Sequence, residues 1–303
     1  VRALEGLETV LDESKPDLVL VHGDTSTTFV ASLAAYYHQI RVGHVEAGLR
    51  THNLYSPYPE EANRQMVGDI AELHFTPTMQ SLKNLLQENK DPEKIYVTGN
   101  TAIDALKTTV KKEYDSPVLQ WAGDGRIILL TAHRRENWGA PLKRIFTAVN
   151  RITEQYPDVR VIYPCHMNPA VRGLADEMFR ENNQVRVIEP LEVTDFHNLI
   201  KKSYLVLTDS GGIQEEGPSL GKPVLVVRET TERPEGVEAG TLKLVGTSTD
   251  NIVKQVSRLL DDEVEYERMS KAENPYGDGH ASERIVDAIL RYFRNRVPEE
   301  ISA

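Results

Sequence analysis

Short apolar runs alternate with longer amphipathic stretches along the whole chain. The opening segment places Leu4, Leu7, Val10 and Leu11 on one helical face, and the apolar run at 18–21 is typical of a buried strand. The same pattern predicts further strands at 42–45, 73–75 and 95–98 and helices at 25–38, 59–68, 79–87 and 102–111. Strands that alternate with helices form parallel sheets covered on both faces.

A segment with Pro117, Gly123 and Gly125, residues 113–125, interrupts this rhythm and is predicted to be a linker between two domains. Beyond it, six apolar runs predict strands at 127–131, 159–163, 185–188, 204–208, 224–227 and 242–245. Six strands make a complete doubly wound sheet. The first half offers about four and begins on a helix, so we expect its opening strand and loop to be missing.

The sequence therefore predicts an α/β protein of two doubly wound, Rossmann-like domains, the first of them incomplete. We place the domains at 1–115 and 116–280, and expect residues 281–303 to form a C-terminal helix that could pack back on the first domain. Ligands of such sheets bind at the carboxyl ends of the strands. Two domains of this kind are expected to face each other across a ligand-binding cleft.

The charge balance narrows the choice of partners. With 35 Lys and Arg against 46 Asp and Glu, the net charge of −11 argues against a general binder of nucleic acid or anionic membranes, although a locally basic pocket can still hold a small anion. No apolar run approaches the roughly 20 residues of a membrane helix. Cys165 is the only cysteine, so no intrachain disulfide can form. The start of the chain shows no signal-peptide pattern, and the cytoplasm is the expected compartment.

The most informative motif, Thr-Asp-Ser-Gly-Gly-Ile-Gln-Glu-Glu at 208–216, ends a predicted strand and opens a helix. Its glycines let a phosphate approach the backbone, and a helix N-terminus supplies unpaired N–H groups. Ser210, Gly211 and Gly212 are therefore candidate phosphate contacts. Glu216, about one turn further on, can accept hydrogen bonds from both hydroxyls of a ribose. The alternative is a tight turn before a solvated acidic helix.

Basic side chains follow the first strand of the second domain, in Thr-Ala-His-Arg-Arg-Glu-Asn at 131–137. His133 and Arg134 at a strand's carboxyl end suit a diphosphate. A surface basic patch paired with Glu136 is the alternative. The next strand ends in Tyr-Pro-Cys-His-Met-Asn-Pro at 163–169, where His166 is either a ligand contact or a satisfied structural group.

Carboxylates follow the strands of the first half. Asp24 in His-Gly-Asp and Glu46 in His-Val-Glu-Ala-Gly come just past buried strands, and Glu60 and Glu61 lie in a Pro-rich segment. Converging carboxylates raise one another's pKa and can divide general acid and base work between them. The alternative is that they cap helices or pair with nearby arginines, Arg50 and Arg64.

No cofactor or metal ion is expected. The His-x-Asp and His-x-Glu pairs at 22–24 and 44–46 resemble metal ligands, but their spacing fits no specific metal motif. The sequence contains no nucleophile elbow, no Walker loop with its Lys and no dinucleotide fingerprint followed by a ribose-binding acid. ATP hydrolysis and a bound NAD are therefore disfavoured.

Taken together, these motifs resemble the bacterial, non-hydrolysing UDP-N-acetylglucosamine 2-epimerases. Seven segments match in family order, at 21–25, 44–50, 59–64, 132–137, 163–169, 209–216 and 228–235. Any one of them is a weak signal, but seven in register over nearly the whole chain are specific. One family element, an N-terminal Gly-Thr-Arg-Pro-Glu loop with a phosphate-contacting Arg and a nearby Lys, has no match in the chain.

The resemblance implies a two-domain GT-B fold, a homodimer, and reversible conversion of UDP-N-acetylglucosamine to UDP-N-acetylmannosamine for cell-surface polysaccharide synthesis. It implies anti elimination of UDP through 2-acetamidoglucal, followed by re-addition. By similarity Glu216 would bind the ribose, Phe196 would lie beside the uracil and Arg233 would help bind the nucleotide. Many bacterial members also need a second UDP-N-acetylglucosamine as an allosteric activator, near the counterparts of Glu60, Arg134 and His166.

The expected site therefore has a catalytic and a substrate-binding set. The catalytic candidates are Asp24, Glu46, Glu60 and His133, and the expected substrate contacts are Arg64, Arg134, His166, Phe196, Ser210, Gly211, Gly212, Glu216 and Arg233.

Two other functions use a similar nucleotide-sugar site. A GT-B glycosyltransferase shares the fold, since fold does not fix function, but needs one acceptor-specific base rather than a carboxylate on each face of the sugar ring. A non-catalytic nucleotide-sugar sensor would keep the loop at 210–216 and has no need of Asp24, Glu46 and Glu60.

Overall fold

The computed structural model describes residues 2–294, so residue 1 and residues 295–303 of the expected C-terminal segment lie outside the described residues. The chain divides into two compact units, the first made of Val1–Asp104 with Tyr276–Ala303 and the second of Ala105–Pro275. The chain passes from the first unit to the second within helix α5 (Thr101–Thr109).

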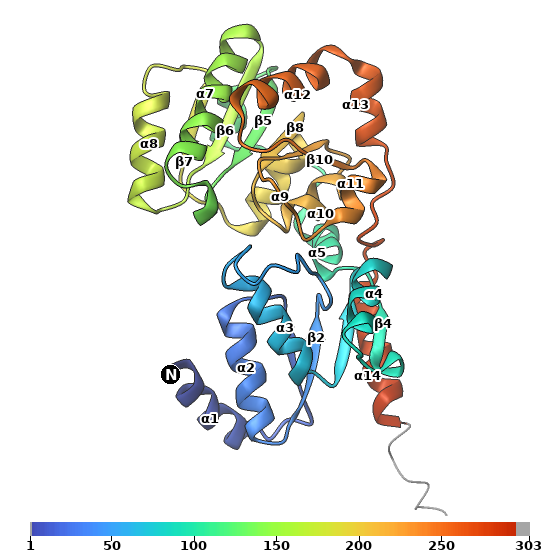
Figure 1. The fold of residues 1–303 in the computed structure, drawn as a ribbon. Helices are drawn as coiled ribbons and strands as arrows, with labels where there is room; N and C mark the ends of the chain where they lie inside the picture. The colour runs from blue at the N-terminus through green and yellow to red at the C-terminus, as the bar shows by residue number, and fades with distance from the viewer. Residues whose placement is uncertain (1, 295–303) are drawn as a thin grey trace, which may run out of the picture. The chain divides into compact units, whose positions relative to one another are not determined.

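The first unit contains a parallel sheet with the strand order β1-β2-β3-β4 (Figure 1). Its strands are β1 (Leu18–His22), β2 (Arg41–Val45), β3 (Leu73–Thr76) and β4 (Ile95–Val97). The helices before and between them are α1 (Arg2–Ser14), α2 (Ser26–Tyr37), α3 (Glu60–Ile70) and α4 (Met79–Gln87), with the short 3-10 turn η1 (Pro92–Lys94) before β4.

Each face of this sheet is covered by a different part of the chain. Neighbouring strands in this sheet are consecutive in the chain, so right-handed crossovers place their connecting helices on one face. On that face Ala35 of α2 and Val67 of α3 pack with Val42. Residues two apart in a strand share a face, so Leu73 and Phe75 both point to the opposite side. There they pack against the last helix, α14 (Ala281–Arg294), through residues such as Ile285, Ala288 and Tyr292.

The second unit contains a six-stranded parallel sheet of order β10-β9-β8-β5-β6-β7. Its strands are β5 (Arg126–Thr131), β6 (Val159–Pro164), β7 (Val185–Ile188), β8 (Leu205–Thr208), β9 (Val224–Val226) and β10 (Leu242–Leu244). The chain builds β5, β6 and β7 in one direction and then returns to the other side of β5 for the remaining three. Among the described strands this reversal of order occurs in the second unit, whereas the first unit runs without one.

Helices cover both faces of the second sheet. They are α6 (Pro117–Ala122), α7 (Ala140–Gln155), α8 (Pro169–Phe179), α9 (Val193–Lys202), α10 (Ile213–Ser219), α11 (Pro234–Ala239), α12 (Thr249–Asp261) and α13 (Glu263–Ser270), with the 3-10 turn η2 (Arg135–Asn137) after β5. The two parallel, Rossmann-like sheets confirm the predicted α/β class.

The segment predicted as a linker differs from that expectation. Within 113–125 the chain forms α6, capped by the Ser116 side chain, which accepts a hydrogen bond from Leu119 N. Val118 and Trp121 of this helix pack against the core of the second unit. The Pro and Gly residues that suggested a linker instead begin and end a short helix, because Pro is favoured in the first turn and Gly just after the last.

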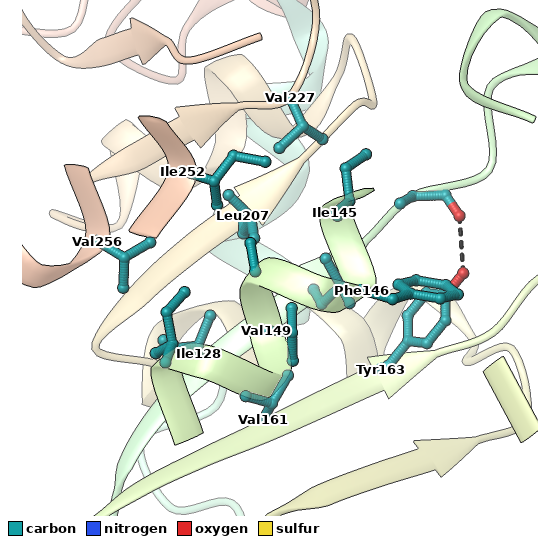
Figure 2. Packing of buried hydrophobic residues seen from close by; sticks show 14 of the residues in the cluster. Ile128, Ile145, Phe146, Val149, Val161, Tyr163, Leu207, Val227, Ile252 and Val256 are labelled. Carbon is teal, nitrogen blue, oxygen red and sulfur yellow. Dashed lines mark hydrogen bonds between the residues drawn. The ribbon is translucent and has the colours of Figure 1, made fainter. Parts of the chain in front are cut away.

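The larger core of the second unit lies between its sheet and helices α7 and α12 (Figure 2). Phe146 of α7 lies edge-on to Tyr163 of β6, with ring centroids 5.5 Å apart, and against Phe179 at 4.7 Å. The buried Tyr163 hydroxyl donates a 2.7 Å hydrogen bond to the carbonyl of Ala132, drawn as a dashed line in Figure 2. This packing fixes the end of β5, where the basic motif begins.

Within residues 2–294 no helix has both the length and the apolar character needed to cross a bilayer.

Phe146→Ala tests the contribution of this core. We expect the free energy of unfolding to fall by about 3–5 kcal/mol, because the substitution removes a buried ring and leaves a cavity among Tyr163 and Phe179. Chemical denaturation, followed through the unfolding transition of the second unit, measures the change in free energy. Val264→Ala, at a position 78% exposed, is the matched control. A loss no larger than the control's would contradict the role given to this ring.

Candidate functional site

The loop that follows β5 and the loop that follows β8 lie side by side. These strands are neighbours in the sheet, with Thr131 paired to Thr208, and the two hydroxyls are 2.5 Å apart. The chain reverses its strand order between them, and ligands of open parallel sheets bind in the crevice at such a reversal, beyond the carboxyl ends of the strands. The segments 132–137 and 209–216, both predicted from sequence as ligand loops, begin here.

Asp209 joins these two loops. Its fully buried carboxylate accepts hydrogen bonds through Oδ2 from the backbone N–H groups of His133 and Arg134, each at 2.8 Å, and from the side-chain amide of Asn137 at 2.9 Å. Its other oxygen, Oδ1, is 3.5 Å from His133 Nδ1. A buried carboxylate requires such donors, so Asp209 fixes the backbone of the basic loop to the end of β8.

His133 and His166 are stacked, with ring centroids 5.7 Å apart and planes 8° from parallel. His166 Nδ1 accepts a hydrogen bond from the Asn168 N–H, so a neutral His166 ring carries its proton on Nε2 and offers it as a donor. Burial lowers the pKa of His133; Asp209 opposes this shift, and Arg134 and His166 reinforce it. His133 is therefore favoured as a neutral ring in the free protein.

The glycine turn at the start of α10 packs closely against the side chain of Arg233. A Cβ atom at Gly211 would come within 2.6 Å of the Arg233 guanidinium, so only glycine fits without displacing it. Arg233 is 4% exposed, and its Nε is 2.5 Å from Glu215 Oε1. The family resemblance implies that Arg233 helps bind the nucleotide. Its placement in the structure favours support of the glycine turn from within the unit.

Arg233 belongs to a chain of ion pairs whose members are buried except for Glu136, which is exposed on one side. It contacts Glu232, Glu232 contacts Arg228 at 3.0 Å, and Arg228 contacts Glu136 at 2.7 Å. Breaking a buried pair leaves an uncompensated charge and costs about 3–5 kcal/mol. This network ties the loop after β9 to both candidate ligand loops, at Glu136 and at Glu215.

Glu216 lies one turn into α10, with its side chain 16% exposed. Phe196 of the neighbouring helix α9 is partly buried against the core of the second unit. His197, next to it, is a residue that the sequence did not single out. Its Nε2 is 3.6 Å from Glu216 Oε2. A single His that matches no motif gives no signal of its role in the sequence alone.

In the first unit, Arg64 of α3 contacts Asp24 with one guanidinium nitrogen, at 2.5 Å, and Glu61 with another, at 2.9 Å. The buried Glu61 also accepts hydrogen bonds from the backbone N–H groups of Thr51 and His52. Burial acts to raise the pKa of Glu61, but these donors and Arg64 outweigh it and hold the pKa below its usual value. Of the adjacent pair at 60 and 61, Glu61 is therefore the structural carboxylate.

Glu46 follows β2 in a left-handed backbone conformation, with φ of 66°, which is uncommon for a residue with a side chain. Its carboxylate accepts a 3.1 Å hydrogen bond from the Asn100 amide, and its Oε2 would be 2.9 Å from a Cβ at Gly23. Strained residues cluster at functional sites, where the surrounding structure holds them in place. Asn100, which caps α5 through its contact with Ala102 N, was not predicted from sequence.

Asp24 and Glu46 thus follow neighbouring strands of the first sheet, β1 and β2, and α3 provides Glu60 at its start and Arg64 one turn later. Of the two arginines expected to pair with these carboxylates, Arg64 does so. Arg50 instead forms a bidentate ion pair with Glu88. Among residues 2–294, no three or more His, Cys, Asp or Glu side chains form a group that could hold a metal ion.

These two sets of residues have distinct chemical capacities. The side chains of His133 and Arg134, the N–H groups of the glycine turn and the Glu216 carboxylate suit an anionic nucleotide, because basic side chains and N–H groups bind phosphate and a carboxylate accepts hydrogen bonds from hydroxyls. The carboxylates after β1 and β2 suit proton exchange.

Comparison with known proteins gives consistent results. A family model described as UDP-N-acetylglucosamine 2-epimerase matches residues 1–290. A curated UDP-N-acetylglucosamine 2-epimerase of Bacillus subtilis is 61% identical over 294 residues, which are 97% of this chain and 77% of the relative.

Two solved structures match this chain over nearly its whole length. The UDP-GlcNAc 2-epimerase of Neisseria meningitidis, bound to UDP-GlcNAc, is 48% identical with a TM-score of 0.91, over 95% of this chain and 80% of that one. The enzyme of Methanocaldococcus jannaschii, in complex with UDP-GlcNAc and UDP, is 36% identical with a TM-score of 0.82, over 96% and 80%.

Acid should destabilise the first unit through His44. This buried ring donates from Nε2 to the carbonyl of Gly23, at 2.8 Å, beside Asp24. Burial lowers the pKa of His44 to about 3 from 6.5, despite that hydrogen bond. Between these values the unfolded chain binds the proton and the folded chain does not, so stability is lost as the pH falls, by at most about 1.4 kcal/mol per pH unit for this group.

His44→Gln keeps a donor near Gly23 and removes the titration. We expect its free energy of unfolding, followed by denaturation between pH 6.5 and 4.5, to depend less on pH than that of the parent. His74, whose pKa burial lowers to about 4, supplies part of the remaining slope. Equal slopes for parent and variant would contradict the assignment.

Proposed function

Because this chain belongs to the UDP-N-acetylglucosamine 2-epimerase family, and is thus an isomerase, we propose that it inverts C2 of the sugar by eliminating UDP and adding it back. The observation that carries the nucleotide half of this proposal is the juxtaposition of the two loops after β5 and β8, joined by Asp209.

The first step is an anti elimination. A base removes the C2 proton, the electron pair forms the C1=C2 double bond of 2-acetamidoglucal, and the C1–O bond to UDP breaks. The C2 hydrogen is barely acidic, so departure of UDP must supply most of the driving force. Charge that develops on the diphosphate is therefore what the protein must stabilise.

We assign that stabilisation to His133, Arg134 and the turn at 210–212. His133 is favoured as a neutral ring before the reaction, so it can become a better donor as the diphosphate gains charge. Glu216 accepts hydrogen bonds from the ribose hydroxyls, and Phe196 lies beside the uracil. Arg233 acts from beneath, by holding the glycine turn.

The second step returns UDP to C1 while a proton reaches C2 from the opposite face. Inversion requires proton exchange on both faces of the ring, which two separate groups perform better than one. Asp24, Glu46 and Glu60 are the candidates. The support for Asp24 and Glu46 is their position after adjacent strands, with Glu46 held in an unfavourable backbone conformation by its surroundings.

The ligands of the solved relatives agree with this assignment. The Neisseria protein binds UDP-GlcNAc, and the Methanocaldococcus protein binds UDP-GlcNAc and UDP. We propose the same sugar nucleotide for this chain, with a product that feeds cell-surface polysaccharide synthesis. The homodimer, and a second UDP-GlcNAc as activator near Glu60, Arg134 and His166, stay predictions.

Incubation with UDP-GlcNAc in heavy water, without any acceptor, tests the proposal. Elimination and re-addition place deuterium at C2 of both epimers, which proton magnetic resonance detects. A glycosyltransferase needs an acceptor, and a sensor leaves C2 unlabelled. Asp24→Asn, Glu46→Gln and Glu60→Gln should each lower deuterium incorporation at least about 100-fold, because an amide cannot act as a base at neutral pH.

The exposed Glu93→Gln is the matched control and should label C2 at the parent's rate. The three test variants should keep their affinity for UDP, since the nucleotide contacts lie in the second unit. A variant that labels C2 at the parent's rate would remove its carboxylate from the proton-transfer set.

Glu216→Ala should weaken UDP binding by about 1–3 kcal/mol, because hydrogen bonds to a charged group are lost. Isothermal titration calorimetry of the folded variant measures the change. Glu238→Ala, at an exposed position of α11, is a control that should leave UDP affinity unaltered. An unchanged affinity for Glu216→Ala would exclude this carboxylate from the ribose site.

A further inference from the structure

His197 lies on α9 and is 2% exposed, so its ring nitrogens can reach only protein groups. Nδ1 is 2.8 Å from the hydroxyl of Thr109, and Nε2 is 3.6 Å from Glu216 Oε2. The imidazole therefore connects the last residue of α5 to the carboxylate assigned to the ribose. The elimination chemistry described above does not use this ring.

The Thr109 hydroxyl has one hydrogen and two acceptors within reach, the carbonyl of Ala105 at 2.9 Å and His197 Nδ1 at 2.8 Å. When the hydroxyl donates to Nδ1, the neutral ring carries its hydrogen on Nε2, and this N–H faces the Glu216 carboxylate at 3.6 Å. In this tautomer the contact is attractive, at a separation just longer than a direct hydrogen bond.

Glu216 is restrained through one of its oxygens. Oε2 faces His197, and the carboxylate lies close to the glycine turn, where a Cβ placed on Gly212 would be 3.5 Å from Oε1. The side chain is 16% exposed, which leaves one edge of the carboxylate open to solvent. A flexible glutamate would have to lose rotamer freedom on binding a ligand, whereas a restrained one has lost it already.

We propose that His197 is a positioning residue that holds the Glu216 carboxylate in the orientation that accepts the ribose hydroxyls of UDP, and so sets the preference for ribonucleotide over deoxyribonucleotide. The inference rests on the ribose role proposed for Glu216. Thr109 anchors the ring and thereby takes part in the same preference.

Two substitutions of His197 separate its two contacts. His197→Asn keeps an amide near the Nδ1 position, toward Thr109, and removes the group that faces Glu216. His197→Gln places an amide donor near the Nε2 position and gives up the Thr109 contact. Both replace a buried ring by a smaller amide, so they control for each other's effect on packing.

Calorimetric titration with UDP and with 2′-deoxy-UDP is the measurement. We expect the parent to prefer UDP, and His197→Asn to bind UDP about 3- to 10-fold more weakly, in line with the cost of ordering one side chain. Its loss for 2′-deoxy-UDP should be smaller, so the preference falls. His197→Gln should keep most of the preference. In turnover with UDP-GlcNAc, KM should rise for His197→Asn while kcat changes less than twofold.

The outcomes distinguish this inference from the role of Glu216. Equal losses of UDP and 2′-deoxy-UDP affinity in His197→Asn, or equal behaviour of the Asn and Gln variants, would overturn the positioning role. If Glu216→Ala keeps the parent's preference for UDP, the proposed ribose site itself fails. If His197→Asn does not fold, Thr109→Val carries the test, because it keeps the ring but removes its anchor. An unchanged preference in that variant would also overturn the inference.

Discussion

The hydrogen bonds that the buried Asp209 accepts hold the candidate nucleotide site together. One carboxylate oxygen binds two consecutive backbone N–H groups, of His133 and Arg134, and the amide of Asn137. The two loops come from strands made far apart in the chain, and the pairing of parallel strands does not fix the conformation of the loops at their ends. Without this carboxylate the backbone N–H groups of His133 and Arg134 would lose their buried acceptor, and the stacking of His133 on His166 would lose its support.

The buried arginines of the second unit form ion pairs within the protein and so stabilise its loops. Arg228 and Arg233 are each almost fully buried and shared among glutamates. The groups left for a nucleotide include the side chains of His133, His166 and Arg134, of which Arg134 alone carries a permanent charge. The elimination and re-addition proposed above require that the protein stabilise the leaving diphosphate without trapping it. A site with few permanent charges suits that balance.

Sequence pattern predicted the strands of both units and the helices of the first, because buried parallel strands are apolar throughout and their helices keep a 3.6-residue period. It also placed the motifs at the carboxyl ends of the strands. The sequence could not show which side chains contact one another in the folded protein. Asp209 and Ser210 are adjacent in one motif, yet one is buried under the loop and the other lies at its turn. Glu60 and Glu61 look equivalent, but the helical turn directs Glu61 into the interior. The proposed role of His197 depends on two residues from other helices. Thr109 lies 88 positions before it in the sequence, and Glu216 lies on α10.

The left-handed backbone at Glu46 also has an evolutionary consequence. A glycine at this position would relieve the backbone strain, by about 1 kcal/mol, and would also remove the carboxylate that we propose for proton exchange. On that assignment, selection for heat resistance alone would favour glycine at position 46 and lower turnover. Selection for turnover would keep a residue that the backbone disfavours. Stability and the proposed activity therefore favour different residues at position 46, and stabilising substitutions found by library methods are best screened for activity there first.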